Sequence, residues 1–188
     1  MAILAIAFGL VCLLFASVGL ARRSSAELRE RFGSEYDRLV GERGSRKAAE
    51  RELRSREARV SKLDLRPLNA EQREKFMTDW LKIQAKFVDD PAGAARLASA
   101  LLKIALQTQG YPSVPFEQRM EYLSVDRARV VEHYRAARAL TDEHPEGKPT
   151  TEDLRQALVH YRIILEELAE PTSHAPHELR IQREASAA

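Results

Sequence analysis

The chain has 188 residues, and its 30 basic side chains nearly balance its 28 acidic ones, which gives a net charge of +2 at pH 7. This balance excludes a general electrostatic affinity for nucleic acid. All of the charged residues follow residue 21, whereas the single cysteine, Cys12, precedes it, so the charged part carries no disulfide. That part, residues 22–188, is long enough to form one domain with its own hydrophobic core.

The first segment, AILAIAFGLVCLLFASVGLA at residues 2–21, contains no charged residue. A helix of this length spans about 30 Å, the thickness of the hydrocarbon core of a bilayer. A cleaved secretory signal has a basic start and a shorter apolar run of about 7–15 residues. Residues 1–21 are therefore predicted to be a retained transmembrane anchor. The alternative is an exported domain that is cut after Gly19-Leu20-Ala21.

Basic residues follow this apolar segment directly, and none precedes it. The nearest are Arg22, Arg23, Arg29 and Arg31. Basic flanks are retained on the cytoplasmic side of a membrane, so we predict a single-pass protein with its amino terminus outside and its body in the cytoplasm. The predicted contact with the lipid bilayer is made by residues 2–21.

Residues 22–44 are predicted to be a helical connector that is interrupted by glycine. Ser24 and Glu27 have the spacing of a capping box. Gly33 and Gly44 suit the left-handed conformation in which helices commonly end. An apolar stripe with a spacing of four crosses the first glycine: Phe32, Tyr36 and Val40.

Charge dominates the next segment, SRKAAERELRSREARVSK at residues 45–62, where the predicted helical domain (45–170) begins. Its apolar positions form only a thin seam: Ala49, Leu53, Val60 and the following Leu63. Acidic and basic residues four apart, such as Glu50 and Arg54, support a helix. Because acids alternate with bases, an exposed helix is predicted. The alternative is a basic surface for anionic lipid or nucleic acid, of which lipid is favoured because the predicted anchor holds this helix near a membrane.

Two helices are predicted after an extended LDLRPL stretch at residues 63–68, which Pro67 keeps out of a helix. The first is capped by Asn69, and its aromatic stripe is assigned to the core: Phe76, Trp80, Ile83 and Phe87. Asp90 and Pro91 begin the second helix. Its predicted buried face contains Ala94, Leu97, Ala98, Leu101, Ile104 and Ala105.

Three further helices are predicted after Gly110-Tyr111-Pro112. The first covers residues 116–123, the second carries Val130, Tyr134 and Ala137, and the third is capped by Thr150. The core positions of the third are Leu154, Ala157, Leu158, Tyr161, Ile164, Leu165 and Leu168. No segment alternates with a period of two for long enough to form a strand, so an all-α bundle of five to seven helices is predicted. Residues 171–188 are predicted to be a disordered tail.

His133 and His160 are the strongest candidates for a functional site because they occupy twin settings, EHYR and VHYR. Two facing helices would bring them together as metal ligands or as an acid–base pair. Each lies one residue from a buried stripe, which favours a helix boundary or solvent, and no third ligand stands at metal spacing. No catalytic, cofactor-binding or metal-ligating residue and no cofactor is therefore assigned, and an enzyme is not predicted.

Six stretches of the sequence support a resemblance to an uncharacterised bacterial family. They are RFGSEYDR (31–38), LDLRPL (63–68), FVDDP (87–91), GYP (110–112), LSVD (123–126) and TEDLRQALVHYR (151–162). Members resemble this chain in having an N-terminal hydrophobic segment before a compact, charged helical body. The resemblance implies one domain and a membrane association, and it implies no activity. For a bacterial protein, the predicted single-pass topology places the anchor in the inner membrane. Some members are labelled as secreted, which supports the exported alternative.

Two classes of function follow from these observations. In the first, the protein is a membrane-tethered helical module, or scaffold, that binds another protein or itself and has no nucleic-acid partner and no evident small-molecule substrate. In the second, it is a metal-binding protein or an enzyme that uses His133 and His160. The first class is the prediction, because the sequence contains no catalytic motif.

Overall fold

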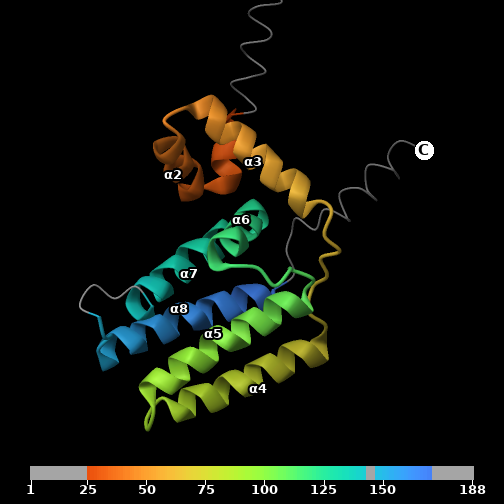
Figure 1. The fold of residues 1–188 in the computed structure, drawn as a ribbon. Helices are drawn as coiled ribbons and strands as arrows, with labels where there is room; N and C mark the ends of the chain where they lie inside the picture. The colour runs from red at the N-terminus through yellow and green to blue at the C-terminus, as the bar shows by residue number, and fades with distance from the viewer. Residues whose placement is uncertain (1–24, 143–146, 171–188) are drawn as a thin grey trace, which may run out of the picture. The chain divides into compact units, whose positions relative to one another are not determined.

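The computed structural model describes residues 25–142 and 147–170. Residues 25–32 are helical, and the later helices of this part of the chain are labelled in Figure 1. They are α2 (Ser34–Arg43), α3 (Arg46–Val60), α4 (Ala70–Lys86), α5 (Pro91–Thr108), α6 (Phe116–Asp126), α7 (Ala128–Thr141) and α8 (Thr151–Ala169). No residue in the two described ranges lies in a β-strand. The all-α prediction is confirmed.

The described helices belong to two compact units, Met1–Ser55 and Arg56–Ala188, and the division between them falls inside α3. Within residues 25–142 and 147–170, no helix is long and apolar enough to cross a membrane. The predicted anchor at residues 2–21 and the predicted tail at residues 171–188 lie outside the described residues.

In the first unit, two glycines end the helices as the sequence predicts. Gly33 has a φ of 52° and Gly44 a φ of 60°, both in the left-handed region. The buried apolar side chains of this unit are Leu28, Phe32, Tyr36, Leu39, Ala49 and Leu53. The Tyr36 hydroxyl donates to Glu50 Oε1 at 3.0 Å and accepts from Arg46 Nε at 3.0 Å. Three residues of the RFGSEYDR stretch thus serve packing and helix termination.

Three long helices, α4, α5 and α8, form one layer of the second unit, and α5 lies between the other two (Figure 1). The aromatic stripe of α4 is buried as predicted, with Phe87 only partly covered. The seven predicted core positions of α8 are all buried: Leu154, Ala157, Leu158, Tyr161, Ile164, Leu165 and Leu168. α7 packs along α8, and α6 packs against α7.

The buried face of α5 differs from the predicted one. Leu97 and Ile104, which the sequence assigns to the core, are 46% and 52% exposed. The observed buried positions are Gly93, Ala94, Ala95, Ala98, Leu101, Leu102, Ala105 and Leu106. Because α5 packs against α4 on one side and α8 on the other, its buried face is wide, and Leu102 and Leu106 lie in it. Leu97 and Ile104 remain on the side that faces solvent.

Arg56 is an exception to the exposure that the sequence predicts for the charged side chains of residues 45–62. The predicted apolar seam is buried at three positions: Ala49, Leu53 and Val60. Arg56 is also buried, with 3% of its surface exposed. Its Nη1 donates to Ser124 Oγ at 3.2 Å, and its Nη2 lies 3.8 Å from a carboxylate oxygen of Glu121. A buried guanidinium needs such partners because removing it from water is costly.

Side-chain caps begin three of the helices, as predicted. Asn69 and Gln72 form a reciprocal capping box at α4, and Thr150 and Asp153 form another at α8. The carboxylate of Asp90 accepts a hydrogen bond from a backbone amide in the first turn of α5. Each cap satisfies amide groups that have no partner within the helix.

Two buried side chains donate hydrogen bonds to backbone carbonyls at the C-terminal end of α8. Gln109 Nε2 donates to the carbonyl of Leu168 at 2.9 Å, and Arg127 donates to the carbonyl of Glu167. The positive charge of Arg127 is favourable here because the last carbonyls of a helix carry partial negative charge. Both ends of α8 are therefore anchored by polar contacts, which holds its side chains in register with the neighbouring helices.

Candidate functional site

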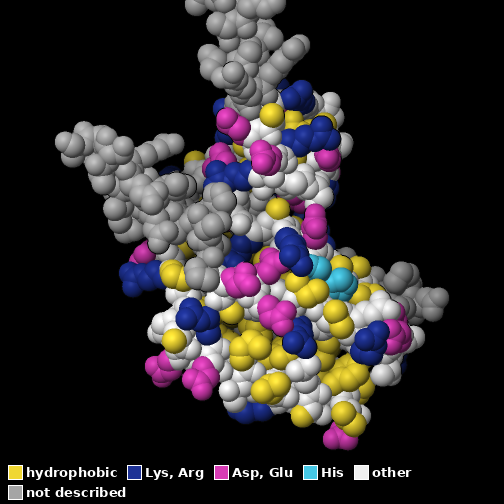
Figure 2. Space-filling model, turned by 180° about the vertical axis from the view of Figure 1, so that it is seen from behind, with side chains coloured by type: hydrophobic (Ala, Val, Ile, Leu, Met, Phe, Trp, Pro, Cys, Tyr) yellow, Lys and Arg dark blue, Asp and Glu magenta, His cyan; other side chains and the backbone are white. Residues whose placement is uncertain are grey.

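His133 on α7 and His160 on α8 meet in the second unit. Their Nδ1 atoms are 2.9 Å apart, and their ring centroids are 5.2 Å apart with the ring planes tilted by 40°. Both side chains are half-buried. Figure 2 shows the two described histidines (cyan) side by side at the surface. The two residues therefore lie together, whereas the sequence-based prediction favoured a helix boundary or solvent for each of them.

The two imidazoles point at each other almost in line. The centroid separation exceeds the Nδ1–Nδ1 separation by about twice the radius of an imidazole ring. Each Nδ1 therefore lies close to the line that joins the two ring centres. A neutral pair in this geometry shares one proton: one Nδ1–H donates, and the other Nδ1 accepts through its lone pair. Two protons cannot occupy this space together.

Burial acts on the protonation of His160. It lowers the pKa of His160, and the charge of a protonated His133 lowers that pKa further. Desolvation disfavours the cationic form of an imidazole, so the neutral ring is favoured in the folded chain. Among residues 25–142 and 147–170, no group of three or more His, Cys, Asp or Glu side chains stands close enough to hold a metal ion.

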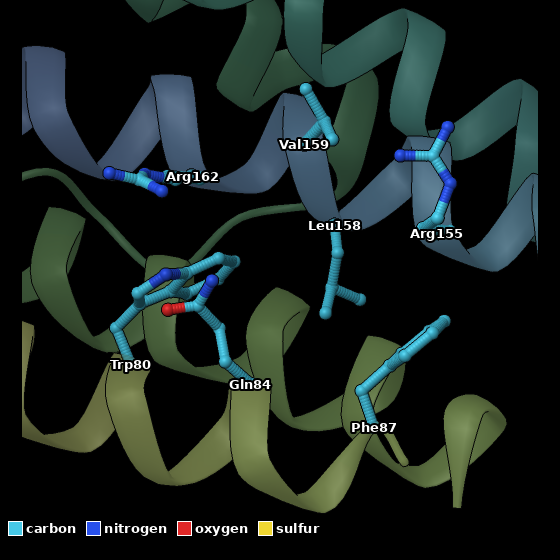
Figure 3. A pocket seen from close by; sticks show the side chains of 7 residues that line it. All are labelled: Trp80, Gln84, Phe87, Arg155, Leu158, Val159 and Arg162. Atoms are coloured by element: carbon cyan, nitrogen blue, oxygen red, sulfur yellow. The ribbon is translucent and has the colours of Figure 1, made fainter.

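A second feature of the same unit is an open groove between α4 and α8, with a volume of about 260 Å³. It is lined by Trp80, Gln84, Phe87, Arg155, Leu158, Val159 and Arg162. Figure 3 shows Trp80 and Gln84 of α4, and Phe87 directly after it, pointing toward α8, and Leu158 pointing back toward α4. The walls are mainly apolar, and the two arginines stand seven residues apart along α8.

Large hydrophobic side chains are exposed in the groove lining and next to lining residues in the sequence. Val159, which lines it, is 47% exposed. Leu81 and Val88, the sequence neighbours of the lining residues Trp80 and Phe87, are 63% and 83% exposed. Figure 2 shows hydrophobic side chains (yellow) gathered below the histidines on this face. An exposed apolar patch around a groove is typical of an interaction site.

The two arginines that line the groove form ion pairs that are exposed to solvent. Arg155 pairs with Glu152 at 2.7 Å and Arg162 with Glu166 at 2.7 Å, and all four side chains are about half exposed. The hydrogen bond from Arg155 lowers the pKa of Glu152 to about 2. Exposed pairs of this kind contribute little to stability, so a charged partner can replace them at small cost. Trp80 Nε1 is buried without a hydrogen-bond partner among the described residues.

The groove is the feature that sequence reasoning missed. Trp80, Phe87 and Leu158 are assigned by their spacing to the core, and the pattern does not reveal that one side of each faces a groove. The available signal was Val159, an apolar residue that lies off the buried stripe of α8. Periodicity identifies the buried face of each helix, but it does not show where a groove stays open between two helices.

Comparison of the chain with protein-family models, with curated proteins and with solved structures finds no match. The resemblance to a bacterial family based on RFGSEYDR and the five other stretches therefore stays a prediction. The candidate functional features of the described residues are the histidine pair and the groove.

Proposed function

We propose that this protein is a membrane-tethered, non-enzymatic interaction module whose α4–α8 groove binds an amphipathic helix of a partner protein. The observation that carries the proposal is the open groove, whose lining includes the exposed Val159. The exposed Leu81 and Val88 directly follow the lining residues Trp80 and Phe87 in the sequence. The tether is the apolar segment at residues 2–21, which is long enough to span a bilayer. The arginines that follow it favour a cytoplasmic body.

A helix is the occupant that best suits the shape of the groove. Small-molecule sites usually enclose about 300–1,000 Å³ and bury most of the ligand. This groove is smaller, at about 260 Å³, and it is open along two helices. An amphipathic helix needs only an apolar channel for its side chains at positions i, i+4 and i+7. The two exposed arginines of the lining, Arg155 and Arg162, are of a residue type that is enriched among the residues that dominate binding energy.

The charges beside the groove favour a partner helix that carries acidic residues. Arg155 and Arg162 are separated by two helical turns and stand on the α8 wall. Carboxylates two turns apart on a partner helix would replace Glu152 and Glu166 as their ion-pair partners. Charge complementarity of this kind orients a partner and speeds its association.

Cross-linking in native membranes with two matched variants tests the groove. Val159→Asp places a charge in it, whereas Leu97→Asp places one on α5 at a position of nearly equal exposure, 46% against 47%. We expect a partner protein to be cross-linked to the wild type and to Leu97→Asp, and at least tenfold less to Val159→Asp. Equal yields from both variants, or recovery of monomer or self-linked chain only, would contradict the proposal.

The tether is tested separately by mass spectrometry of the N-terminus and by alkaline extraction of membranes. The proposal predicts an intact N-terminus and a protein that stays in the membrane fraction after extraction. An N-terminus near residue 22, on a protein released from membranes, would support the exported alternative. In that case the groove could still be tested on the released domain.

A further inference from the structure

We infer that His133 and His160 form a two-coordinate site for a soft monovalent cation, Cu⁺, for which Ag⁺ is a stable substitute. The inference goes beyond the docking proposal and uses none of its groove residues. It rests on the in-line approach of the two Nδ1 atoms at 2.9 Å. In such an arrangement both lone pairs are directed at one point between the rings.

The coordination geometry selects the type of ion. Zinc in proteins usually takes four ligands in a tetrahedron, and within the described part of the chain no third metal-ligating side chain joins this pair. Imidazole is a good ligand for copper. Cu⁺ and Ag⁺ are filled-shell ions that accept two nitrogen ligands in a line, so they need no third side chain. The pair therefore favours these ions over divalent ones.

A small side-chain movement admits the ion. Metal–imidazole bonds of about 2.0 Å place the two nitrogens of a linear pair about 4 Å apart, so they must separate by about 1 Å. The half-buried rings can rotate toward solvent. The helices behind them are held by the buried neighbours Tyr134 and Tyr161, whose rings pack edge to face at 6.4 Å. The backbone spacing can thus stay fixed while the rings adjust.

The ion takes the place of the shared proton. In the neutral pair, one Nδ1–H donates to the other Nδ1. When the ion binds, the proton of the donor ring moves to its Nε2, and both Nδ1 lone pairs bind the metal. Two neutral imidazoles and one monovalent ion give a complex of charge +1, with no net release of protons and no change of oxidation state.

The test is a titration of the full-length chain with Ag⁺, and with Cu⁺ in competition with a chromophoric Cu⁺ chelator. Cys12→Ser is used as the background because a thiolate binds both ions tightly. We expect one equivalent of ion to bind per chain, and affinity to fall at least tenfold in His133→Gln and in His160→Gln. His144→Gln serves as the matched control and is expected to bind as the background protein does.

Imidazole nitrogen resonances give a second measurement that needs no substitution at the site. In ¹⁵N-histidine-labelled protein, Ag⁺ should shift the Nδ1 resonances of two histidines together and leave the other three in place. Absence of binding, equal affinity of the background protein and both site variants, or unshifted Nδ1 resonances would overturn the inference. Zn²⁺ binding as tight as Cu⁺ binding would also overturn it, because that result requires further ligands.

Discussion

Gly110 follows α5 and packs against the backbone of the extended LDLRPL segment, and its own backbone conformation requires a glycine. Its φ is +99°, and a Cβ atom there would lie 2.4 Å from the carbonyl oxygen of Asp64. The amide of Arg66 donates to the carbonyl of Gln109 at 2.9 Å, which fixes the same junction. The close approach of two backbone segments thus depends on the missing side chain.

Replacement of Gly110 by alanine is predicted to lower the free energy of unfolding by more than the roughly 1–3 kcal/mol that a strained backbone alone costs. Gly147→Ala is the matched control, since Gly147 has a φ of +86° but nothing within 4 Å of its Cβ position. Denaturant titration of both variants separates backbone strain from the clash. Equal losses in the two variants would show that the junction with Asp64 does not constrain the fold.

The buried phenol of Tyr111 makes the free energy of unfolding depend on pH in the alkaline range. Burial raises its pKa to about 12, against an ordinary value of 10.0. The folded state therefore holds the phenol proton more tightly than the unfolded state. This contribution to stability is complete below pH 10 and is lost as the pH rises from 10 to about 12.

In Tyr111→Phe, this loss should be absent. Between about pH 9 and pH 11, the free energy of unfolding of the wild type should fall by on the order of 1 kcal/mol more than that of the variant. Urea titrations at the two pH values measure the difference. Identical pH dependence in both proteins would mean that Tyr111 is not buried as described.

At the scale of helices, the capping box of α8 gives a sharp comparison between adjacent residues. Thr150 Oγ1 accepts from the amide of Asp153 at 3.2 Å, whereas Thr151 is exposed in the first turn. Thr150→Ala is predicted to lower the free energy of unfolding by about 1 kcal/mol. Thr151→Ala should change it by less than about 0.5 kcal/mol. Thermal unfolding of both variants checks the order, and the reverse order would contradict the cap.

The observed packing of α5 predicts a large difference between two of its leucines. Leu102 is fully buried, and Leu97 is half exposed. Leu102→Ala should lower the free energy of unfolding by about 2–5 kcal/mol through a cavity, and Leu97→Ala by less than about 1 kcal/mol. Denaturant titration distinguishes them. A larger loss at Leu97 would restore the buried face that the sequence pattern predicts.

Helix caps can be predicted from the sequence alone, whereas the packing of one helix against others cannot. The caps at Asn69, Asp90 and Thr150 are local hydrogen bonds, so their residue types alone predict them. The two-sided burial of α5 depends on α4 and α8 together, and a single apolar stripe does not encode it. The twin settings of His133 and His160 suggested their pairing, but the in-line geometry depends on how α7 and α8 pack.

At the scale of the whole chain, the second unit combines a buried hydrophobic core with the open groove between α4 and α8. α5 lies between these helices, and the side chains of Trp80, Phe87 and Leu158 cover only part of the space. Val159 lines this groove and is exposed, and the exposed Leu81 and Val88 directly follow its lining residues Trp80 and Phe87 in the sequence. Exposed apolar surface of this kind is costly unless a partner covers it.

The most direct measurement is photo-cross-linking from single positions of the full-length protein in its own membranes. A photoreactive amino acid is placed in turn at the five exposed apolar positions: Leu81, Val88, Leu97, Ile104 and Val159. The docking proposal predicts that one partner protein is linked through a helical segment from residues 81, 88 and 159, and not from 97 and 104. Equal linking from all five positions, or none from the first three, would contradict it.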